Sequence, residues 1–104
     1  MKRKIEKYYK LLNILKKCLP PKKPVIVRRV HIPDDDCFIE GECMLIKNKF
    51  FYIRINKKMN EYQSMDALIH EWAHTLSWNT EKDFHGSKWG VAYAKVYRTY
   101  LREF

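Results

Sequence analysis

The sequence of 104 residues predicts one α+β domain with a basic N-terminal helix, a small, mainly antiparallel three-stranded sheet and two further helices. Three segments carry apolar residues at the helical period, which indicates helices. Between the first and the second of these segments lie short runs of β-branched and aromatic residues, which favour strands. A chain of this length that is 46% hydrophobic can bury a single core. We therefore expect residues 1–104 to form one domain.

The first expected helix spans Lys2–Cys18 and lies in the most basic part of the chain. Its apolar side consists of Ile5, Tyr8, Leu12 and Leu15, and the prolines at positions 20, 21 and 24 should end it. Residues 1–30 contain eleven Lys or Arg and one acid, whereas residues 31–104 contain ten Lys or Arg and eleven acids. Such a basic stripe suits contacts with nucleic-acid phosphates that do not read sequence, and a solvated outer face is the alternative. The candidate phosphate contacts are Arg3, Lys7, Lys10 and Lys17.

Three strands are expected between the first helix and the second. They cover Val25–Val30, Met44–Ile46 and Phe50–Asn56, and Lys47-Asn48-Lys49 should form the turn between the last two. Alternation in the third strand predicts that Phe51, Ile53 and Ile55 face the core. The acidic run Asp34-Asp35-Asp36 is expected to be a solvated turn, because it lacks the spacing of a calcium loop.

The second expected helix carries the motif H-E-x-x-H at residues 70–74. Ser64 is the expected N-cap, and the core stripe should consist of Met65, Ile69, Trp72 and Leu76. Histidines at i and i+4 lie on one face of a helix, where they can bind two adjacent corners of a zinc tetrahedron. From its place about 100° further round, Glu71 can take a proton from an activated water. The alternative is a pair of solvated histidines on an amphipathic helix.

The third metal ligand is expected to be His85, which follows the motif after a polar loop. Gly86-Ser87 should begin the last helix, whose apolar stripe consists of Trp89, Tyr93, Val96 and Tyr100. Glu81 and Asp83 in the loop are alternative oxygen ligands, but we expect both to be solvated loop charges. We predict Zn²⁺ bound by His70, His74 and His85, because three-histidine sites are common for catalytic zinc.

Two further roles complete the predicted site. Glu71 should act as the general base, and Tyr93 or Tyr97 should stabilise the oxyanion, although both tyrosines would also suit a core. The strand at Phe50–Asn56, just before the zinc helix, is expected to pair with an extended peptide by strand addition.

Other zinc-peptidase patterns fit this chain less well. The metzincin pattern H-E-x-x-H-x-x-G-x-x-H needs a glycine and a histidine where this chain has Ser77 and Thr80. A gluzincin-type site needs a glutamate on a later helix, and the sequence offers Glu103 alone after Asp83. The three-histidine arrangement therefore remains the prediction.

Together these residues resemble the SprT-like zinc metallopeptidases, the family that includes Spartan. The resemblance runs from Gly41 to Tyr97, through the third strand, the H-E-x-x-H helix and the segment His85-Gly86-Ser87-Lys88-Trp89. It implies a zincin-like minimal metallopeptidase whose third ligand is His85 and whose substrates are proteins on or near DNA. Larger members carry a four-cysteine zinc ribbon after the core, and this chain is expected to lack one.

The cysteines and the hydropathy pattern favour a cytoplasmic protein. Cys18, Cys37 and Cys43 form no even disulfide framework and lack C-x-x-C spacing, which fits a reducing compartment. No run of 18 apolar residues is present, so no membrane span or membrane partner is expected.

The sequence thus predicts a zinc-dependent endopeptidase, which the resemblance directs to DNA-associated proteins. Two other functions use the same three histidines. One is a zinc-containing nucleic-acid-binding module, and the other is a metal-dependent nuclease. Glu71 argues against a purely structural zinc site, which needs no neighbouring carboxylate.

Overall fold

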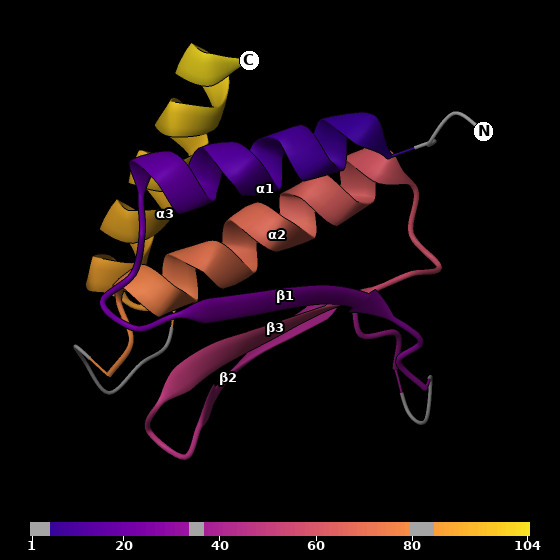
Figure 1. Ribbon diagram of the computed structural model, residues 1–104, viewed down its shortest axis with the longest axis horizontal. Helices are drawn as coiled ribbons and strands as arrows, with labels where there is room; N and C mark the ends of the chain where they lie inside the picture. The colour runs from indigo at the N-terminus through magenta and orange to yellow at the C-terminus, as the bar shows by residue number, and fades with distance from the viewer. Residues whose placement is uncertain (1–4, 34–36, 80–84) are drawn as a thin grey trace.

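The computed structural model describes residues 5–33, 37–79 and 85–104 and confirms the predicted α+β layout (Figure 1). The helices of this described part are α1 (Glu6–Cys18), α2 (Glu61–Leu76) and α3 (Ser87–Glu103). Its strands are β1 (Val25–Val30), β2 (Gly41–Ile46) and β3 (Phe50–Asn56). Figure 1 shows α1 stacked on α2 on one side of the sheet, with α3 beside them. Several predicted features lie outside the described residues, namely Arg3, the turn at Asp34-Asp35-Asp36, Glu81 and Asp83.

The sheet is mixed, with the strand order β1-β3-β2. β3 pairs antiparallel with β2, as expected for a mainly antiparallel sheet. Its pairing with β1 is parallel. The reason is geometric. Since β1 and β2 run in opposite directions and β3 lies between them, one of the two pairings has to be parallel.

The central position of β3 also shows that the predicted strand addition on Phe50–Asn56 is wrong. Both hydrogen-bonding edges of β3 are occupied by neighbouring strands, so a peptide has no edge there to pair with. Of the two outer strands, β2 is the one that lies beside the predicted catalytic residue, because Gly41 is in close contact with Glu71. Any peptide that adds to the sheet at the site must therefore pair with β2.

The turn between β2 and β3 forms where the sequence predicts it. Lys47 and Asn48 both have left-handed backbone angles, with φ of 49° and 58°, and Lys49 N donates to Ile46 O at 2.8 Å. Two such residues in succession form the turn whose twist matches that of an antiparallel hairpin. β2 begins at Gly41, earlier than the predicted Met44, because pairing with β3 extends the strand through residues of weak strand propensity.

The core lies between the sheet and α2 and confirms the predicted apolar faces. The fully buried side chains include Leu11, Leu15, Ile53, Ile55, Leu68, Trp72 and Val96. Trp72 also donates its indole N–H to Leu19 O at 2.9 Å, so α2 is fixed to the end of α1. α3 packs against the same core through Val96, with Trp89, Tyr93 and Tyr100 partly buried around it.

The N-terminus of α2 differs from the prediction. Asn60 is the N-cap, and it forms a capping box with Gln63: Gln63 N donates to Asn60 Oδ1 at 2.8 Å, and Asn60 N donates to Gln63 Oε1 at 3.1 Å. The predicted cap Ser64 is wrong, because it lies one turn inside the helix and is fully buried. The pattern Asn-x-x-Gln at 60–63 is the sequence signal for this cap.

Replacing Asn60 with alanine should lower the free energy of unfolding by about 1 kcal/mol, since the capping side chain satisfies a helical N–H. The measurement is urea unfolding, with a lower midpoint and an unchanged slope. Ser64→Ala is the matched control. Its hydroxyl has no hydrogen-bond partner among the described residues, so its removal should cost much less. A larger loss in Ser64→Ala than in Asn60→Ala would contradict the assigned cap.

Candidate metal centre

The three predicted histidine ligands converge on one point. His70 and His74 project from successive turns of α2, and His85 lies just before α3. The Nε2 atom of His85 is 3.1 Å from that of His70 and 3.2 Å from that of His74. The structure therefore brings together residues that the loop after α2 separates in the sequence.

These distances suit a shared metal ion. Zinc binds imidazole nitrogens at about 2.0–2.1 Å, and two such ligands of a tetrahedral site lie about 3.3 Å apart. Within the described part of the chain, these three histidines are the one group of three or more potential ligands whose atoms lie close together, all within 4.8 Å. The cluster could thus hold a metal ion.

Burial keeps the histidines of α2 in the form that a metal needs. Burial and the neighbouring His85 lower the pKa of His70, and burial together with His70 and His85 lowers the pKa of His74 to about 4. Metal ions bind the neutral imidazole and compete with protons for its lone pair. Without a metal, these two rings are therefore neutral at pH 7 and available as ligands.

Glu71 lies buried on α2 next to the histidines, with 8% of its surface exposed. Burial, with smaller contributions from Glu42 and Glu40, raises the pKa of its carboxyl to about 7. A general base works best when its pKa lies near the operating pH. Gly41 lies beside this side chain, since a Cβ there would be at an ordinary contact distance of 3.5 Å from Glu71; the tight approach, 3.0 Å, would be to Arg54 O.

Trp89 forms one wall of the site, a role that the sequence reasoning missed. Its ring centroid is 4.9 Å from those of His70 and His85 and 5.6 Å from that of His74. The sequence predicts Trp89 as part of the apolar stripe of α3, and it also packs against the core as predicted. The available signal was its position four residues after His85, which places both side chains on one side of the helix start.

A cavity of about 290 Å³ is lined by the three histidines and Glu71, and also by Cys43 and Trp78. Burial, and then the nearby Glu71, raises the pKa of the Cys43 thiol to about 12. Cys43 is not part of the group of ligand atoms that lie within 4.8 Å of one another, which consists of His70, His74 and His85. The ligand set is therefore made of imidazoles.

The two candidate oxyanion donors lie beside this cavity. Tyr93 and Tyr97 line an adjoining hollow of about 630 Å³ that also includes His70 and Glu71. Tyr93 packs between Trp89, at 5.1 Å, and Tyr97, at 6.2 Å between ring centroids. Both hydroxyl-bearing side chains are therefore near the proposed base, and the oxyanion role stays a prediction.

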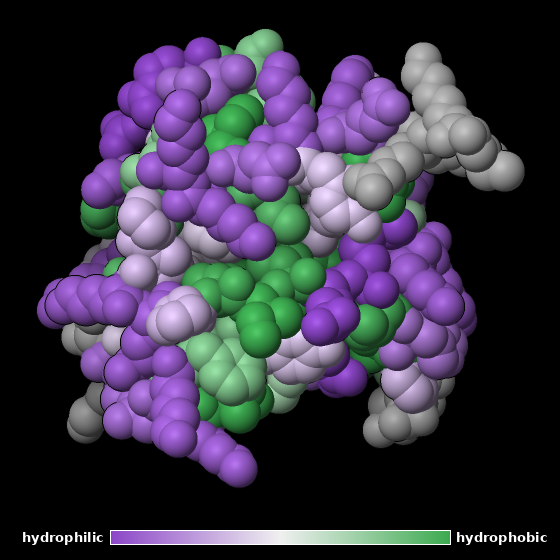
Figure 2. Space-filling model, viewed as in Figure 1, coloured by the Kyte–Doolittle hydropathy of each residue, from purple (hydrophilic) through white to green (hydrophobic). Residues whose placement is uncertain are grey.

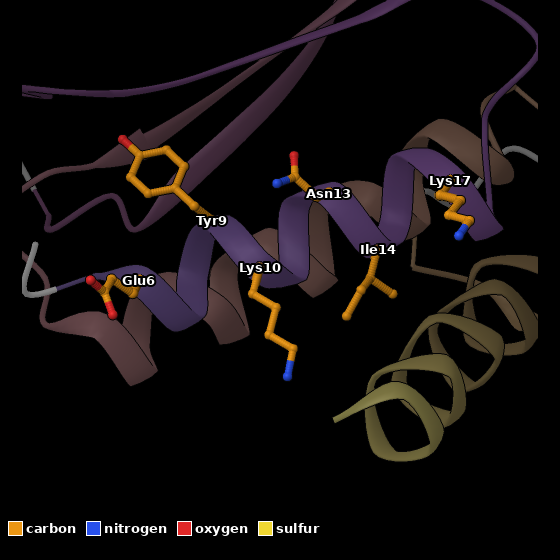
Figure 3. Close-up of a pocket in the computed structure, with 6 residues that line it drawn as sticks. All are labelled: Glu6, Tyr9, Lys10, Asn13, Ile14 and Lys17. Atoms are coloured by element: carbon orange, nitrogen blue, oxygen red, sulfur yellow. The ribbon is translucent and has the colours of Figure 1, made fainter.

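The basic helix α1 lies apart from the histidine cluster. Figure 2 shows hydrophilic side chains along α1 and apolar ones in the middle of the same face. Lys7 Nζ is 3.3 Å from Tyr62 Oη, and Lys10 Nζ lies 4.7 Å from the Phe104 ring centroid. Lys10 and Lys17 line a hollow of about 570 Å³ that is built from α1 (Figure 3) and shares no lining residue with the histidine cavity. Two of the predicted phosphate contacts thus already have partners within the chain, and nucleic-acid binding stays a prediction.

No family model, curated protein or solved structure matches this chain. The resemblance to SprT-like peptidases therefore rests on the motif residues and their spacing. In the described part of the chain, no helix has both the length and the apolar character needed to cross a bilayer.

Proposed function

We propose that this protein is a zinc-dependent endopeptidase. The observation that carries the proposal is the convergence of three imidazole nitrogens beside a buried carboxylate in one cavity. A structural zinc site needs four protein ligands and no base, whereas a catalytic site has three protein ligands and an open position. The combination of His70, His74 and His85 with Glu71 matches the second kind.

Each residue has a role in this proposal. Zinc held by the three histidines would polarise the scissile carbonyl and lower the pKa of water to roughly 7. Glu71 accepts the proton of the attacking water and then delivers it to the leaving amine. Tyr93 or Tyr97 donates a hydrogen bond to the developing oxyanion.

The substrate backbone is proposed to pair with β2. This strand forms an outer edge of the described sheet, and Gly41, Glu42 and Cys43 border the histidine cavity. An extended peptide that adds to this edge gains main-chain hydrogen bonds and lies across the site. The family resemblance suggests that the substrates are DNA-associated proteins.

A reducing intracellular compartment is proposed as the setting. All three cysteines are free in the structure, and Cys18 and Cys37 are exposed. Exposed thiols persist in compartments where glutathione and thioredoxin keep them reduced.

The test combines metal analysis with three labelled substrates: an unstructured protein, an RNA and a single-stranded DNA. We expect about one zinc per chain and cleavage of the protein, which a chelator abolishes and added zinc restores. Metal-dependent cleavage of RNA or DNA alone would instead support the nuclease. Nucleic-acid binding without any cleavage would support the binding module.

If α1 contacts nucleic acid, the variant Lys10→Glu/Lys17→Glu should bind DNA or RNA more weakly at low salt. Its binding should also depend less steeply on salt, because fewer counterions are released. The measurement is fluorescence anisotropy at several salt concentrations. The matched control is Lys57→Glu/Lys95→Glu, which changes the net charge equally at exposed positions away from that hollow. Equal binding by both variants would show that the charges of α1 are a solvated face.

A further inference from the structure

Three hollows have lining residues from both β2 and α2. The histidine cavity is in the middle, and it shares Gly41, His70 and Glu71 with the hollow of about 630 Å³ on one side. On the other side it shares Trp78 with a hollow of about 460 Å³. These three adjoining hollows are called the trough, and the candidate metal site lies in the middle one.

One end of the trough is acidic. Besides Glu71, its described lining includes the exposed carboxylates of Glu40 and Asp66, and no lysine or arginine is among these lining residues. The side chains of Tyr93 and Tyr97 form the aromatic part of the wall. Carboxylates beside aromatic rings attract a lysine or arginine side chain through charge pairing and cation–π contacts.

The opposite end is basic and apolar. It lies where the segment between α1 and β1, the end of α2 and the β2–β3 hairpin meet (Figure 1). Lys22 and Lys23 are its charged lining residues, and no acid is among the described residues that line it. The apolar side chains around them are Pro20, Pro21, Leu45, Phe51, Leu76 and Trp78. This end suits an apolar side chain next to an acidic one.

The direction of β2 relates these two ends to the direction of a substrate. β2 runs from Gly41 at the acidic end to Leu45 at the basic end. Antiparallel pairs are slightly more stable per residue than parallel pairs, so an added peptide should run the opposite way. Its residues before the scissile bond then lie at the basic end, and those after it lie at the acidic end.

We propose that the trough selects peptides by the order of their charges, with an acidic and apolar segment before the scissile bond and a lysine or arginine after it. This inference rests on the proposed peptidase function and adds its substrate preference. The residues that set the preference are Lys22 and Lys23 at one end and Glu40 and Asp66 at the other. Since all four charges border solvent-accessible hollows, salt should weaken the selection.

The experiment compares two peptides of identical composition around the same central apolar pair. One carries Asp before the pair and Lys after it, and the other has the reversed order. We expect the zinc-loaded protein to cleave the first peptide about tenfold faster in kcat/KM at low salt, with a smaller ratio in high salt, given the modest size of exposed charge pairs. A neutral peptide with the same central pair serves as the reference substrate.

Two double variants locate the effect. Lys22→Glu/Lys23→Glu should reduce the rate ratio between the two peptides to about one or invert it, as expected for removal of two exposed charge pairs. Lys57→Glu/Lys95→Glu changes the net charge equally outside the three hollows and should leave the ratio as it is. If both variants change the ratio alike, overall charge rather than the trough sets the preference, and the proposal is overturned.

Binding measurements separate this inference from the peptidase proposal. The zinc-loaded Glu71→Gln variant should bind the first peptide more tightly than the reversed one, whether or not the wild type cleaves either. If the first peptide binds more tightly but no peptide is cleaved, the peptidase proposal is overturned and the proposed charge preference is supported. The protein could instead cleave the neutral peptide but cleave the two charged peptides at equal rates, or the reversed one faster. That result would overturn the proposed charge preference and leave the peptidase proposal in place.

Discussion

Glu71→Gln should reduce turnover of a protein substrate at least about a hundredfold while the protein retains its metal, because general base catalysis typically contributes 10²–10⁴-fold. Glutamine has nearly the shape of glutamate, so the packing against Gly41 is preserved, but its amide accepts no proton at neutral pH. None of the histidine nitrogens is altered. The variant should therefore lose catalytic turnover but keep its metal binding.

The measurement is kcat for cleavage of an unstructured protein, with zinc content determined on the same samples. Glu61→Gln is the matched control for loss of one carboxylate from α2, since Glu61 lines none of the three hollows of the trough. Its effect on kcat should be far smaller. Activity of Glu71→Gln close to that of the wild type would reject Glu71 as the base.

The same variant should be more stable than the wild type above neutral pH when both are free of metal. Burial raises the pKa of Glu71 from an ordinary 4.5 to about 7 in the folded state, so folding favours the protonated carboxyl. Its contribution is present below pH 4.5 and is lost as the pH rises to about 7, which amounts to at most about 3 kcal/mol. Urea unfolding should therefore show a gain for Glu71→Gln at pH 8 that disappears near pH 4.

The features that the sequence predicted correctly depend on local geometry. His70 and His74 lie one helical turn apart on the same face, so their juxtaposition follows from the period of α2. Periodicity also identified the buried faces, such as Tyr8 and Leu15 on α1 and Ile53 on β3. The position of His85 could be predicted as well, since the chain between it and α2 is long enough to return to the other two histidines.

The features that the sequence did not predict depend on contacts between distant segments. The order β1-β3-β2 follows from how the strands pack under α2, and no residue in Phe50–Asn56 marks that strand as central. The charge difference along the trough has the same origin. Lys22 and Lys23 follow α1 in the sequence, and they line the basic end of the trough. The chain is fixed there because Pro24 O accepts a hydrogen bond from Phe51 N at 2.8 Å at the start of the sheet.

His85→Ala should weaken zinc binding by more than about a hundredfold, which is the upper range for residues that merely support metal ligands. His85 is close to both other histidines, so its removal leaves two ligands where catalytic zinc needs three. Turnover should fall with the metal content. The measurements are zinc stoichiometry after dialysis and a competition titration against a chelator of known affinity.

Loss of metal in this variant would report on ligation rather than on folding, because the His85 side chain is exposed and contributes little to the core. The metal-free His85→Ala protein should accordingly unfold at nearly the same urea concentration as the metal-free wild type. His31→Ala is the matched control, since His31 is also exposed and lies outside the three-histidine cluster. It should keep its zinc. If His85→Ala also binds one equivalent of zinc with wild-type affinity, His85 is not a ligand, and the convergence of the three Nε2 atoms has another cause.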